Sequence, residues 1–339
     1  MVLAWDVPVK RSRMEKQCKK QYARMARFSL ERRLCGMNKI DLTVNFAGII
    51  LENPITTASG TFSPADSGKF YDINQLGAVI TKGIALQAWE GNPTPRIGET
   101  YGGMLNSVGL QNPGVNYYIE NDLEFLKGFK TKVIANVVGR TIEEYCQVVE
   151  KLNETSVAML EINISCPNIK KGGIGFGTDP KMAGEVTKAV KAVSKKPIII
   201  KLTPNVTDIA EIAKAVEAEG ADGISLINTL LGMSIDINRR RPVLANGMGG
   251  LSGPAIKPVA VRMVYQVCRA VKIPVIGLGG ISTGEDAVEF IMAGATAISV
   301  GTAALVNPTA PIDVKEGLLT YMQSNGFKSI KEIRDAFCG

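Results

Sequence analysis

The most informative absence in this sequence is histidine, which does not occur once in 339 residues. Imidazole is the side chain that most often acts as a general base near neutral pH and as a metal ligand. Its absence excludes Ser-His-Asp and Cys-His relays and HExxH zinc sites. Any acid–base chemistry must therefore come from Cys, Asp, Glu, Lys or Tyr.

Cysteine clusters are also missing, because none of the six cysteines forms a CxxC pair. We therefore predict no metal site and no disulfide framework. No apolar run approaches the roughly 18 residues that a membrane-spanning helix needs. The N-terminus has no apolar signal-peptide core, so we expect a cytoplasmic protein without a membrane span.

The net charge of +7 is confined to the start of the chain. Residues 1–36 contain ten Lys and Arg but three Asp and Glu, and the rest of the chain is neutral. A neutral body gives no reason to expect nucleic-acid binding. We predict a basic N-terminal extension, 1–36, and one folded domain, 37–339. Four interpretations of the extension stay open: a disordered tail, an upstream start with Met37 as the natural first residue, a basic amphipathic helix on a membrane or nucleic acid, and a targeting sequence.

Eight short apolar runs rich in Val and Ile recur through the predicted domain. They occupy residues 55–58, 78–82, 133–138, 157–163, 197–202, 222–227, 274–278 and 296–300. Near-continuous apolar character is typical of parallel strands buried on both faces. Amphipathic stretches that indicate helices lie between several of them, at 141–153, 180–194, 207–220, 254–272 and 283–294. Thr207 and Thr283 are the expected N-caps of two of these helices.

Strands that alternate with helices over about 300 residues indicate an α/β fold, a (β/α)8 TIM barrel. A doubly wound sheet is the alternative, but its GxGxxG fingerprint is absent. Residues 41–44 and 48–51 indicate a short N-terminal hairpin that plugs the N-terminal end of the barrel. The connections 83–132 and 228–273 are long and follow strands, so we expect them on the C-terminal face, where barrel enzymes keep their active sites.

Polar side chains lie in or directly after most of the predicted strands. Lys82 and Lys201 are the most informative, because a lysine in an apolar strand is costly unless it has a partner. A lysine that snorkels to solvent at a strand end is the alternative for either residue. Further polar residues in these positions are Asn136, Glu161, Asn163, Asn228 and Thr229.

Glycines follow the last two predicted strands, at Gly279, Gly280 and Gly301. Loops at these places commonly bind a phosphate in barrel enzymes through free backbone N–H groups. Tight turns that need a positive φ are the alternative. FMN fits the pattern, and Lys201 would then stabilise the flavin ring, which becomes anionic on reduction.

Cys166 lies in the segment NISCPN, residues 163–168, directly before a glycine-rich stretch. Because no histidine is available, a thiol near its working pKa is a leading candidate for the general base. An inert loop cysteine is the alternative.

Several longer motifs occur together and in order: TKGIALQAWEGNPTPRIGET, MLNSVGLQNPG, NISCPN, INTLLGM, LANGMGGLSGPA, and GLGGIS followed by GAT and VGT. Over residues 37–318 this set resembles the class 1 dihydroorotate dehydrogenases, and in detail the class 1B catalytic subunit. The resemblance implies an FMN enzyme on a (β/α)8 barrel that oxidises (S)-dihydroorotate to orotate in pyrimidine (UMP) biosynthesis. Similar class 2 enzymes carry serine where this chain has Cys166, which favours class 1.

The resemblance also implies roles for single residues. Cys166 would remove the proton at carbon 5 while the hydride at carbon 6 passes to FMN. The implied substrate-binding residues are Lys82, Asn106, Ser107, Val108, Gly109, Leu110, Asn163, Asn168, Asn228 and Thr229. The implied cofactor-binding residues are Ala58, Ser59, Gly60, Lys82, Gly83, Asn136, Asn163, Lys201, Ile227, Gly253, Gly279, Gly280, Gly301 and Thr302.

The electron acceptor is suggested by what the chain lacks, a dinucleotide fingerprint and a cysteine cluster. Reduction of NAD⁺ would therefore need a second subunit. The resemblance implies a partner with FAD and an iron–sulfur cluster, in a heterotetramer around a homodimer core. The alternatives are a fumarate-linked class 1A enzyme, a related FMN barrel that reduces a pyrimidine or a tRNA uridine, and a barrel that has lost activity and serves as a binding module.

Overall fold

The central element of the fold is a closed barrel of eight parallel strands, in the spatial order β10-β15-β16-β3-β4-β7-β8-β9. The computed structural model describes residues 40–165 and 175–338. The barrel strands are β3 (Ile55–Thr57), β4 (Ala78–Ile80), β7 (Lys132–Val137), β8 (Met159–Asn163), β9 (Ile198–Lys201), β10 (Gly223–Leu226), β15 (Val275–Leu278) and β16 (Ala297–Val300). They are the eight predicted strands, and the closed sheet confirms the barrel over the doubly wound alternative.

The barrel strands are buried on both faces, as their apolar runs predicted. Every residue in them except Lys132 is buried. Each fully buried Val or Ile side chain contributes about 1.5–3 kcal/mol relative to an exposed one. The predicted extension, 1–36, lies outside the described residues, so the division at residue 36 stays a prediction.

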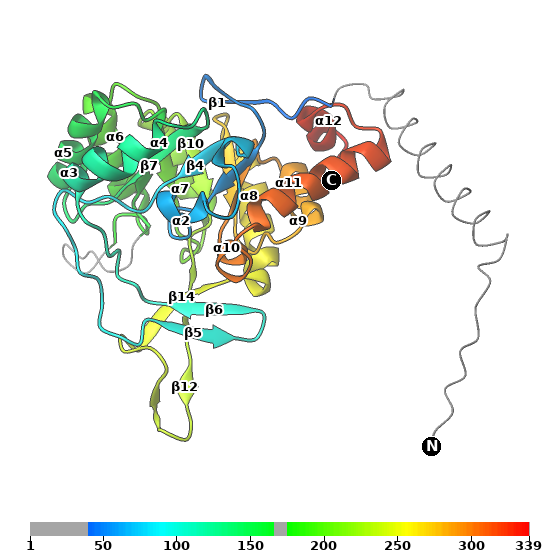
Figure 1. Cartoon of the computed structure of the whole chain (residues 1–339). Coiled ribbons are helices and arrows are strands. Elements are labelled where there is room, and N and C mark those ends of the chain that lie inside the picture. Colours follow the sequence, from blue (N-terminus) through cyan, green and yellow to red (C-terminus); the bar gives the residue numbers. More distant parts are fainter. Residues whose placement is uncertain (1–39, 166–174, 339) are drawn as a thin grey trace, which may run out of the picture. The chain divides into compact units, whose positions relative to one another are not determined.

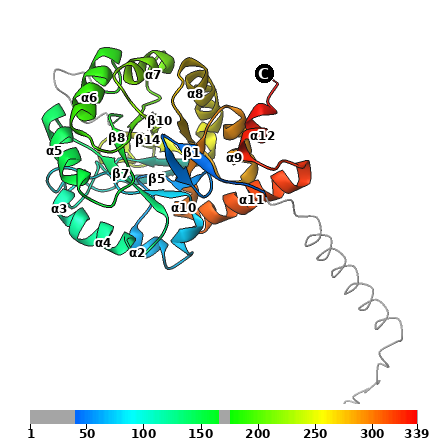
Figure 2. The ribbon, with the colours of Figure 1, turned by 90° about the horizontal axis from the view of Figure 1, so that it is seen from above.

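Helices surround the barrel and connect its strands (Figure 1), and Figure 2 shows them as a ring around the strands. The longer helices are α5 (Ile142–Asn153), α6 (Pro180–Val193), α7 (Ile209–Ala218), α8 (Lys257–Ala270), α9 (Gly284–Met292), α11 (Ala310–Asn325) and α12 (Ile330–Asp335). The short ones are α2 (Pro64–Ser67), η1 (Ile73–Gln75), α3 (Val115–Tyr117), η2 (Tyr118–Asp122), α4 (Leu123–Leu126), η3 (Pro254–Ile256) and α10 (Thr302–Val306). All five predicted helices are present.

One of the two predicted helix caps is correct. The Thr283 hydroxyl accepts a hydrogen bond from the Asp286 N–H at 3.2 Å, which begins α9. The prediction that Thr207 caps α7 is wrong, because Asp208 has the extended backbone directly before the helix and accepts from the Ala210 N–H at 2.8 Å. Asp and Thr are both good N-cap residues. Which of two such neighbours caps the helix therefore depends on which one directly precedes the first helical turn.

The N-terminal hairpin covers one end of the barrel, as predicted. Its strands are β1 (Val44–Phe46) and β2 (Ile49–Leu51), so the first begins later than expected, and Asp41 pairs with Ser329 instead. Phe46 is fully buried, and a Cβ on Gly223 of β10 would lie 2.6 Å from its ring. Figure 2 shows β1 over the strands at this end.

The two long connections combine into one small antiparallel sheet. Its strands are β5 (Ile97–Thr100), β6 (Gly103–Asn106), β11 (Leu230–Met233) and β14 (Met248–Ser252), in the order β11-β14-β6-β5. A further hairpin, β12 (Ile235–Asp236) with β13 (Arg241–Pro242), extends from it. Figure 1 shows this sheet and hairpin projecting from the end of the barrel opposite β1. Both connections therefore lie on the C-terminal face, as expected.

Candidate functional site

The C-terminal end of the barrel gathers the predicted site residues that the structure describes. Ala58, Ser59 and Gly60 follow β3, Lys82 and Gly83 follow β4, Asn136 lies in β7, Asn163 ends β8, Lys201 ends β9, Ile227, Asn228 and Thr229 follow β10, Gly279 and Gly280 follow β15, and Gly301 and Thr302 follow β16. Asn106 ends β6 with Ser107, Val108, Gly109 and Leu110 behind it, and Gly253 follows β14. Cys166 and Asn168 lie outside the described residues. Because parallel strands share one carboxyl end, residues far apart in the sequence meet here.

Lys201 reaches across the mouth of the barrel. Its Nζ donates to the Ser59 hydroxyl at 3.3 Å, although β9 and β3 stand on opposite sides of the ring of strands. The residue is 5% exposed, and no carboxylate of the described residues forms an ion pair with it. A buried ammonium group with one neutral partner favours the binding of a negative charge nearby.

Lys82 is a second cation at this end of the barrel. It is half-buried and has no hydrogen bond or ion pair with another described residue. Burial lowers the pKa of Lys82 below its usual value of 10.5, because desolvation disfavours the charged form. A bound carboxylate would oppose that effect and stabilise the ammonium group.

A chain of hydrogen-bonded polar side chains runs from the end of β10 to β7 and β8. The Asn228 amide donates to the Ser165 hydroxyl, which donates to Oδ1 of Asn163 at 2.6 Å. Nδ2 of Asn163 donates to Oδ1 of Asn136 at 3.5 Å. Nδ2 of Asn136 in turn donates to Oε2 of Glu161. The fold therefore joins four amide and carboxyl side chains in one connected path.

Two further contacts hold this path in place. The Ser225 hydroxyl donates to Oε1 of Glu161 at 2.7 Å, and the Tyr145 hydroxyl donates to the Asn163 carbonyl at 2.8 Å. Glu161, Ser165 and Ser225 were not among the predicted site residues. Glu161 stands out in the sequence as a polar residue within an apolar strand, although no role was assigned to it, and Ser225 carries the same signal, since a buried polar group needs a partner.

Glycines after β14 and β15 make a narrow turn at the edge of the mouth. Gly280 has φ +82°, and a Cβ there would lie 2.9 Å from the Gly253 carbonyl oxygen and 2.8 Å from Cβ of Lys257. A Cβ on Gly279 would lie 3.2 Å from Cγ1 of Ile227. Glycine is therefore required here, because any side chain would clash with these neighbours.

The loops after β3 and β16 lie beside this turn. A Cβ on Gly301 would lie 3.3 Å from Cβ of Ala58. The Thr302 hydroxyl donates to the Ser252 hydroxyl at 2.8 Å, directly before Gly253. The structure thus brings together predicted cofactor residues from the loops after β3, β14 and β16.

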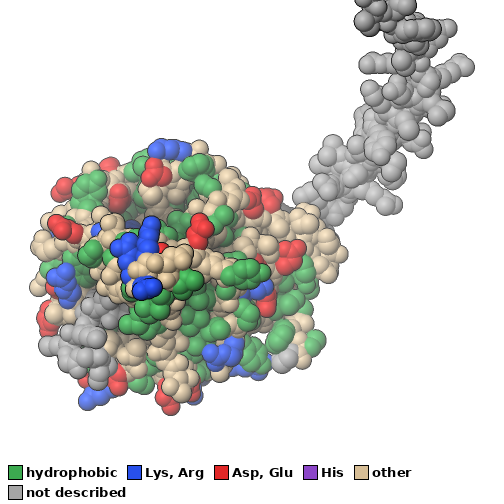
Figure 3. All heavy atoms as spheres, turned by 90° about the horizontal axis from the view of Figure 1, so that it is seen from below, with side chains coloured by type: hydrophobic (Ala, Val, Ile, Leu, Met, Phe, Trp, Pro, Cys, Tyr) green, Lys and Arg blue, Asp and Glu red, His purple; other side chains and the backbone are tan. Residues whose placement is uncertain are grey.

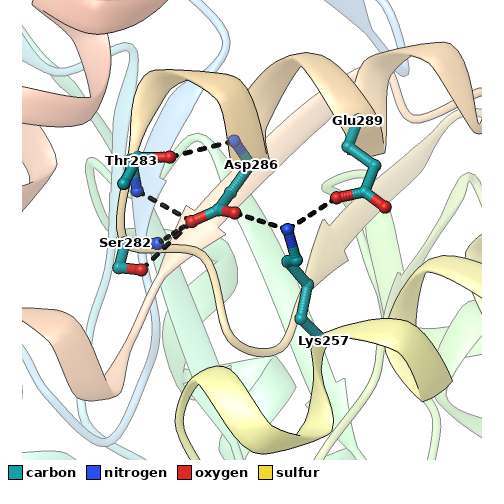
Figure 4. A network of polar contacts seen from close by, with 5 residues as sticks. All are labelled: Lys257, Ser282, Thr283, Asp286 and Glu289. Atoms are coloured by element: carbon teal, nitrogen blue, oxygen red, sulfur yellow. Dashed lines mark hydrogen bonds and ion pairs between the residues drawn. The ribbon is translucent and has the colours of Figure 1, made fainter.

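An ion-pair network fixes the loop between β15 and α9 (Figure 4). Nζ of Lys257 lies 2.7 Å from both Asp286 and Glu289. Asp286 also accepts from the Ser282 and Thr283 backbone N–H groups at 2.9 Å. The hydrogen bond that Lys257 donates to Asp286 raises the pKa of Lys257. Burial alone would raise the pKa of Asp286, but its hydrogen bonds, first from Lys257, lower it overall.

The loop after β6 has unusual backbone geometry. Gly109 and Leu110 both have left-handed φ, +78° and +56°, and a Cβ on Gly109 would lie 2.7 Å from the Asn92 backbone nitrogen. A leucine in this region is uncommon, and such residues cluster at ligand sites. The Ser107 hydroxyl is buried and has no hydrogen-bond partner among the described residues. An unsatisfied buried hydroxyl is costly unless a ligand pairs with it.

One face of the projecting sheet and hairpin is apolar and exposed. Every second residue from β11 into the hairpin, Leu231, Met233, Ile235 and Ile237, is at least half exposed, as is Met248, which pairs with Met233. Figure 3 views this end of the molecule and shows hydrophobic side chains gathered beside a group of Lys and Arg. Exposed apolar side chains that gather on one face are typical of interaction sites.

Residues 40–165 and 175–338 contain neither a metal-binding cluster nor a membrane-spanning helix. No group of three or more Cys, Asp or Glu side chains in these ranges could hold a metal ion. No helix there combines the length and the apolar character that crossing a bilayer demands.

The closed barrel and its polar C-terminal mouth define the chain as a (β/α)8-barrel protein with an enzyme-like site. Residues 41–322 match the family model described as dihydroorotate dehydrogenase. The chain belongs to the dihydroorotate dehydrogenase family, whose members are oxidoreductases.

Curated relatives of high sequence identity carry one and the same name within this family. A protein of Alkaliphilus metalliredigens is 64% identical over 299 residues, which cover 88% of this chain and 99% of that one. A protein of Geotalea uraniireducens is 55% identical over 88% of this chain and 98% of its own. Both are named dihydroorotate dehydrogenase B (NAD(+)), catalytic subunit. The crystal structure of DHODH from Eimeria tenella with ferulenol has a TM-score of 0.72, 22% identity and 88% coverage of both chains, which supports the fold.

Proposed function

We propose that this chain oxidises (S)-dihydroorotate to orotate in pyrimidine biosynthesis, with FMN at the barrel mouth, and passes the electrons to NAD⁺ through a second subunit. The observation that carries the proposal is the pair Lys82 and Lys201, two cations at the barrel mouth without a carboxylate partner among the described residues. Dihydroorotate supplies a carboxylate, and a reduced flavin supplies a second negative charge.

The described residues fit FMN. The turn at Gly253, Gly279 and Gly280 leaves backbone N–H groups and no side-chain bulk, which suits a phosphate. Lys201 stands at the mouth with one neutral contact, to Ser59. When bound, FMN supplies the acceptor of the hydride, and Lys201 would stabilise the charge that follows. The other residues that the sequence predicted to bind the cofactor are also proposed to contact FMN.

Substrate binding is assigned to Lys82 and to the amide side chains. Lys82 holds the carboxylate. The amides of Asn106, Asn163, Asn168 and Asn228 match a ring of alternating N–H and C=O groups, because each amide both donates and accepts. The unpartnered Ser107 hydroxyl and the left-handed backbone at Leu110 support a ligand contact at the loop after β6. Val108, Gly109 and Thr229 complete the proposed set.

Cys166 is the proposed base. Its thiolate takes the proton from carbon 5, the hydride leaves carbon 6, and the two electrons of the carbon 5 C–H bond form the C5=C6 double bond of orotate. A thiol can serve because its ordinary pKa, about 8.5, lies closer to neutral pH than that of any other side-chain type in this histidine-free chain.

The partner is proposed to be an electron-transfer subunit with FAD and an iron–sulfur cluster, in a heterotetramer around a homodimer of this chain. The name shared by the relatives, catalytic subunit, supports a second subunit. The exposed apolar face at Leu231, Met233 and Ile235 supports association, because such a face is buried in stable interfaces. A cytoplasmic location stays a prediction.

Anaerobic addition of dihydroorotate to the FMN-loaded protein tests the reaction. The visible absorbance of the flavin is expected to bleach in one turnover, and NAD⁺ should restore it after the partner subunit is added. Cys166→Ala is expected to bind orotate but to bleach far more slowly. A flavin that dithionite bleaches and dihydroorotate does not would overturn the proposal.

A further inference from the structure

Glu161 is a fully buried carboxyl group inside the barrel, and no described Lys or Arg forms an ion pair with it. Its two oxygens accept hydrogen bonds from Nδ2 of Asn136 and from the Ser225 hydroxyl. A buried carboxyl group is costly, and both of these donors are neutral. The proposed reaction gives it no role.

The hydrogen bonds that lead to Glu161 all run in one direction. Asn228 donates toward Ser165, Ser165 toward Asn163, Asn163 toward Asn136, and Asn136 toward Glu161. An amide has distinct donor and acceptor ends, so one reversed amide would set donor against donor or acceptor against acceptor at its neighbours. A hydroxyl can point either way and cannot set the direction by itself.

The carboxyl group sets this direction at the Asn136 end of the path. Both oxygens of Glu161 accept hydrogen bonds, so Asn136 turns Nδ2 toward Glu161 and Oδ1 toward Asn163. Asn163 must then donate to Asn136 and turn Oδ1 toward Ser165. The Ser165 backbone N–H also donates to Oδ1 of Asn163 at 3.3 Å. The direction is therefore set from both ends of the path, by this N–H at Asn163 and by Glu161 at Asn136.

We propose that Glu161 is a positioning residue that fixes the amide orientation of Asn136 and, through it, supports that of Asn163 for the ligands at the barrel mouth. The inference rests on the proposed function for the identity of those ligands. Glu161 touches neither ligand in this assignment and acts through the two asparagines. Without it, Asn136 is directed only by the 3.5 Å contact from Asn163, so both of its amide orientations become accessible and only one presents the correct donor and acceptor.

The test variant is Glu161→Met, which has a similar length and no acceptor. Loss of one correctly oriented hydrogen bond is expected to weaken binding of orotate and of FMN about 10- to 100-fold. Orotate binding is measured by perturbation of the flavin spectrum at saturating FMN, and FMN binding by quenching of flavin fluorescence in the apoprotein.

The rescue variant is the double substitution Asn136→Asp with Glu161→Gln. The introduced glutamine amide donates to the new carboxylate at position 136, while its carbonyl still accepts from Ser225. That carboxylate in turn still accepts from Asn163. The direction at Asn163 and the net charge are both kept, so most of the orotate affinity is expected to return. A purely structural role for Glu161 predicts no such recovery.

Asn53→Asp is the matched control, a buried amide-to-carboxylate exchange at the opposite end of the barrel. Its Nδ2 donates to the Gln75 carbonyl at 2.9 Å, so the exchange should lower the thermal midpoint and leave both affinities unchanged. Unchanged affinities in Glu161→Met, or equal losses in the single and double variants, would overturn the inference. Failure of the unaltered protein to bind orotate would instead overturn the proposed function, and the FMN measurement would still test Glu161.

Discussion

Nζ of Lys201 lies 3.3 Å from the Ser59 hydroxyl, and this hydrogen bond joins opposite sides of the barrel mouth. The two residues are 142 positions apart in the sequence. The contact places a buried positive charge over the barrel axis, in the position from which it can act on a ligand held there.

Lys201→Met is therefore expected to weaken FMN binding and to lower the reduction potential of the bound flavin, because the reduced form loses its nearby cation. The loss in affinity should be about 10- to 100-fold. Fluorescence titration and a dye-coupled potential measurement check this, with Ser59→Ala as the control that keeps the charge. A potential that does not change would contradict the role of Lys201.

Lys82 leads to a pH prediction. Orotate binding should favour charged Lys82, and burial lowers the pKa of Lys82 in the ligand-free protein below 10.5. Orotate affinity is thus expected to be full below that lowered pKa and to fall as the pH rises through it. Lys82→Met should lower the affinity about 10- to 100-fold and abolish this dependence. Titrations between neutral and alkaline pH measure it, and an identical pH profile in both proteins would contradict the assignment.

Removal of the Lys82 charge should not destabilise the ligand-free protein. Burial lowers the pKa of Lys82 in the folded state, so the charged group destabilises the folded protein at pH values below that pKa. This destabilisation disappears as the pH rises toward 10.5, the usual pKa of an exposed lysine. The thermal midpoint of Lys82→Met at neutral pH is expected to equal or exceed that of the unaltered protein. A lower midpoint would show that Lys82 has a stabilising partner.

Asp286→Asn is expected to reduce the free energy of unfolding by about 1–3 kcal/mol, because it weakens both the cap of α9 and the ion pair with Lys257. The lowered pKa of Asp286 means that this stabilisation is present above pH 3.8 and is lost as the pH falls through the folded-state value. Urea unfolding at several pH values measures the difference. Glu289→Gln, which keeps the cap, should cost less than about 1 kcal/mol.

The exposed apolar face gives a prediction about assembly. Ile235→Lys is expected to shift the protein toward smaller assemblies, because a charge would be buried in the proposed contact. Sedimentation velocity measures the change. Ile50→Lys is the control, an exposed residue of β2 at the other end of the barrel. Equal behaviour of the two variants would contradict the proposed contact.

Several elements of the fold could be predicted locally. The run 274–278 is apolar throughout and the run 197–202 is apolar except for Lys201, which is typical of strands buried on both faces, and both are barrel strands. Thr283 caps α9 because the signal lies within four residues. The small antiparallel sheet was not predictable in the same way, because β6 and β14 pair across some 140 residues and are glycine-rich. Leu231 and Met233 look like core residues in the sequence, yet they are exposed.

The sequence by itself determined the class of chemistry, because a chain without histidine restricts the possible bases, and Lys82 and Lys201 at the ends of apolar strands need a charged ligand or solvent. It also determined the barrel, since strand and helix periodicity are local properties of the chain. Tertiary structure alone decided that Lys201 meets Ser59 across the mouth and that Asn228, Ser165, Asn163 and Asn136 form one path toward Glu161. Hydrogen-bond direction depends on which donors face which acceptors, and closure of the barrel brings those groups together.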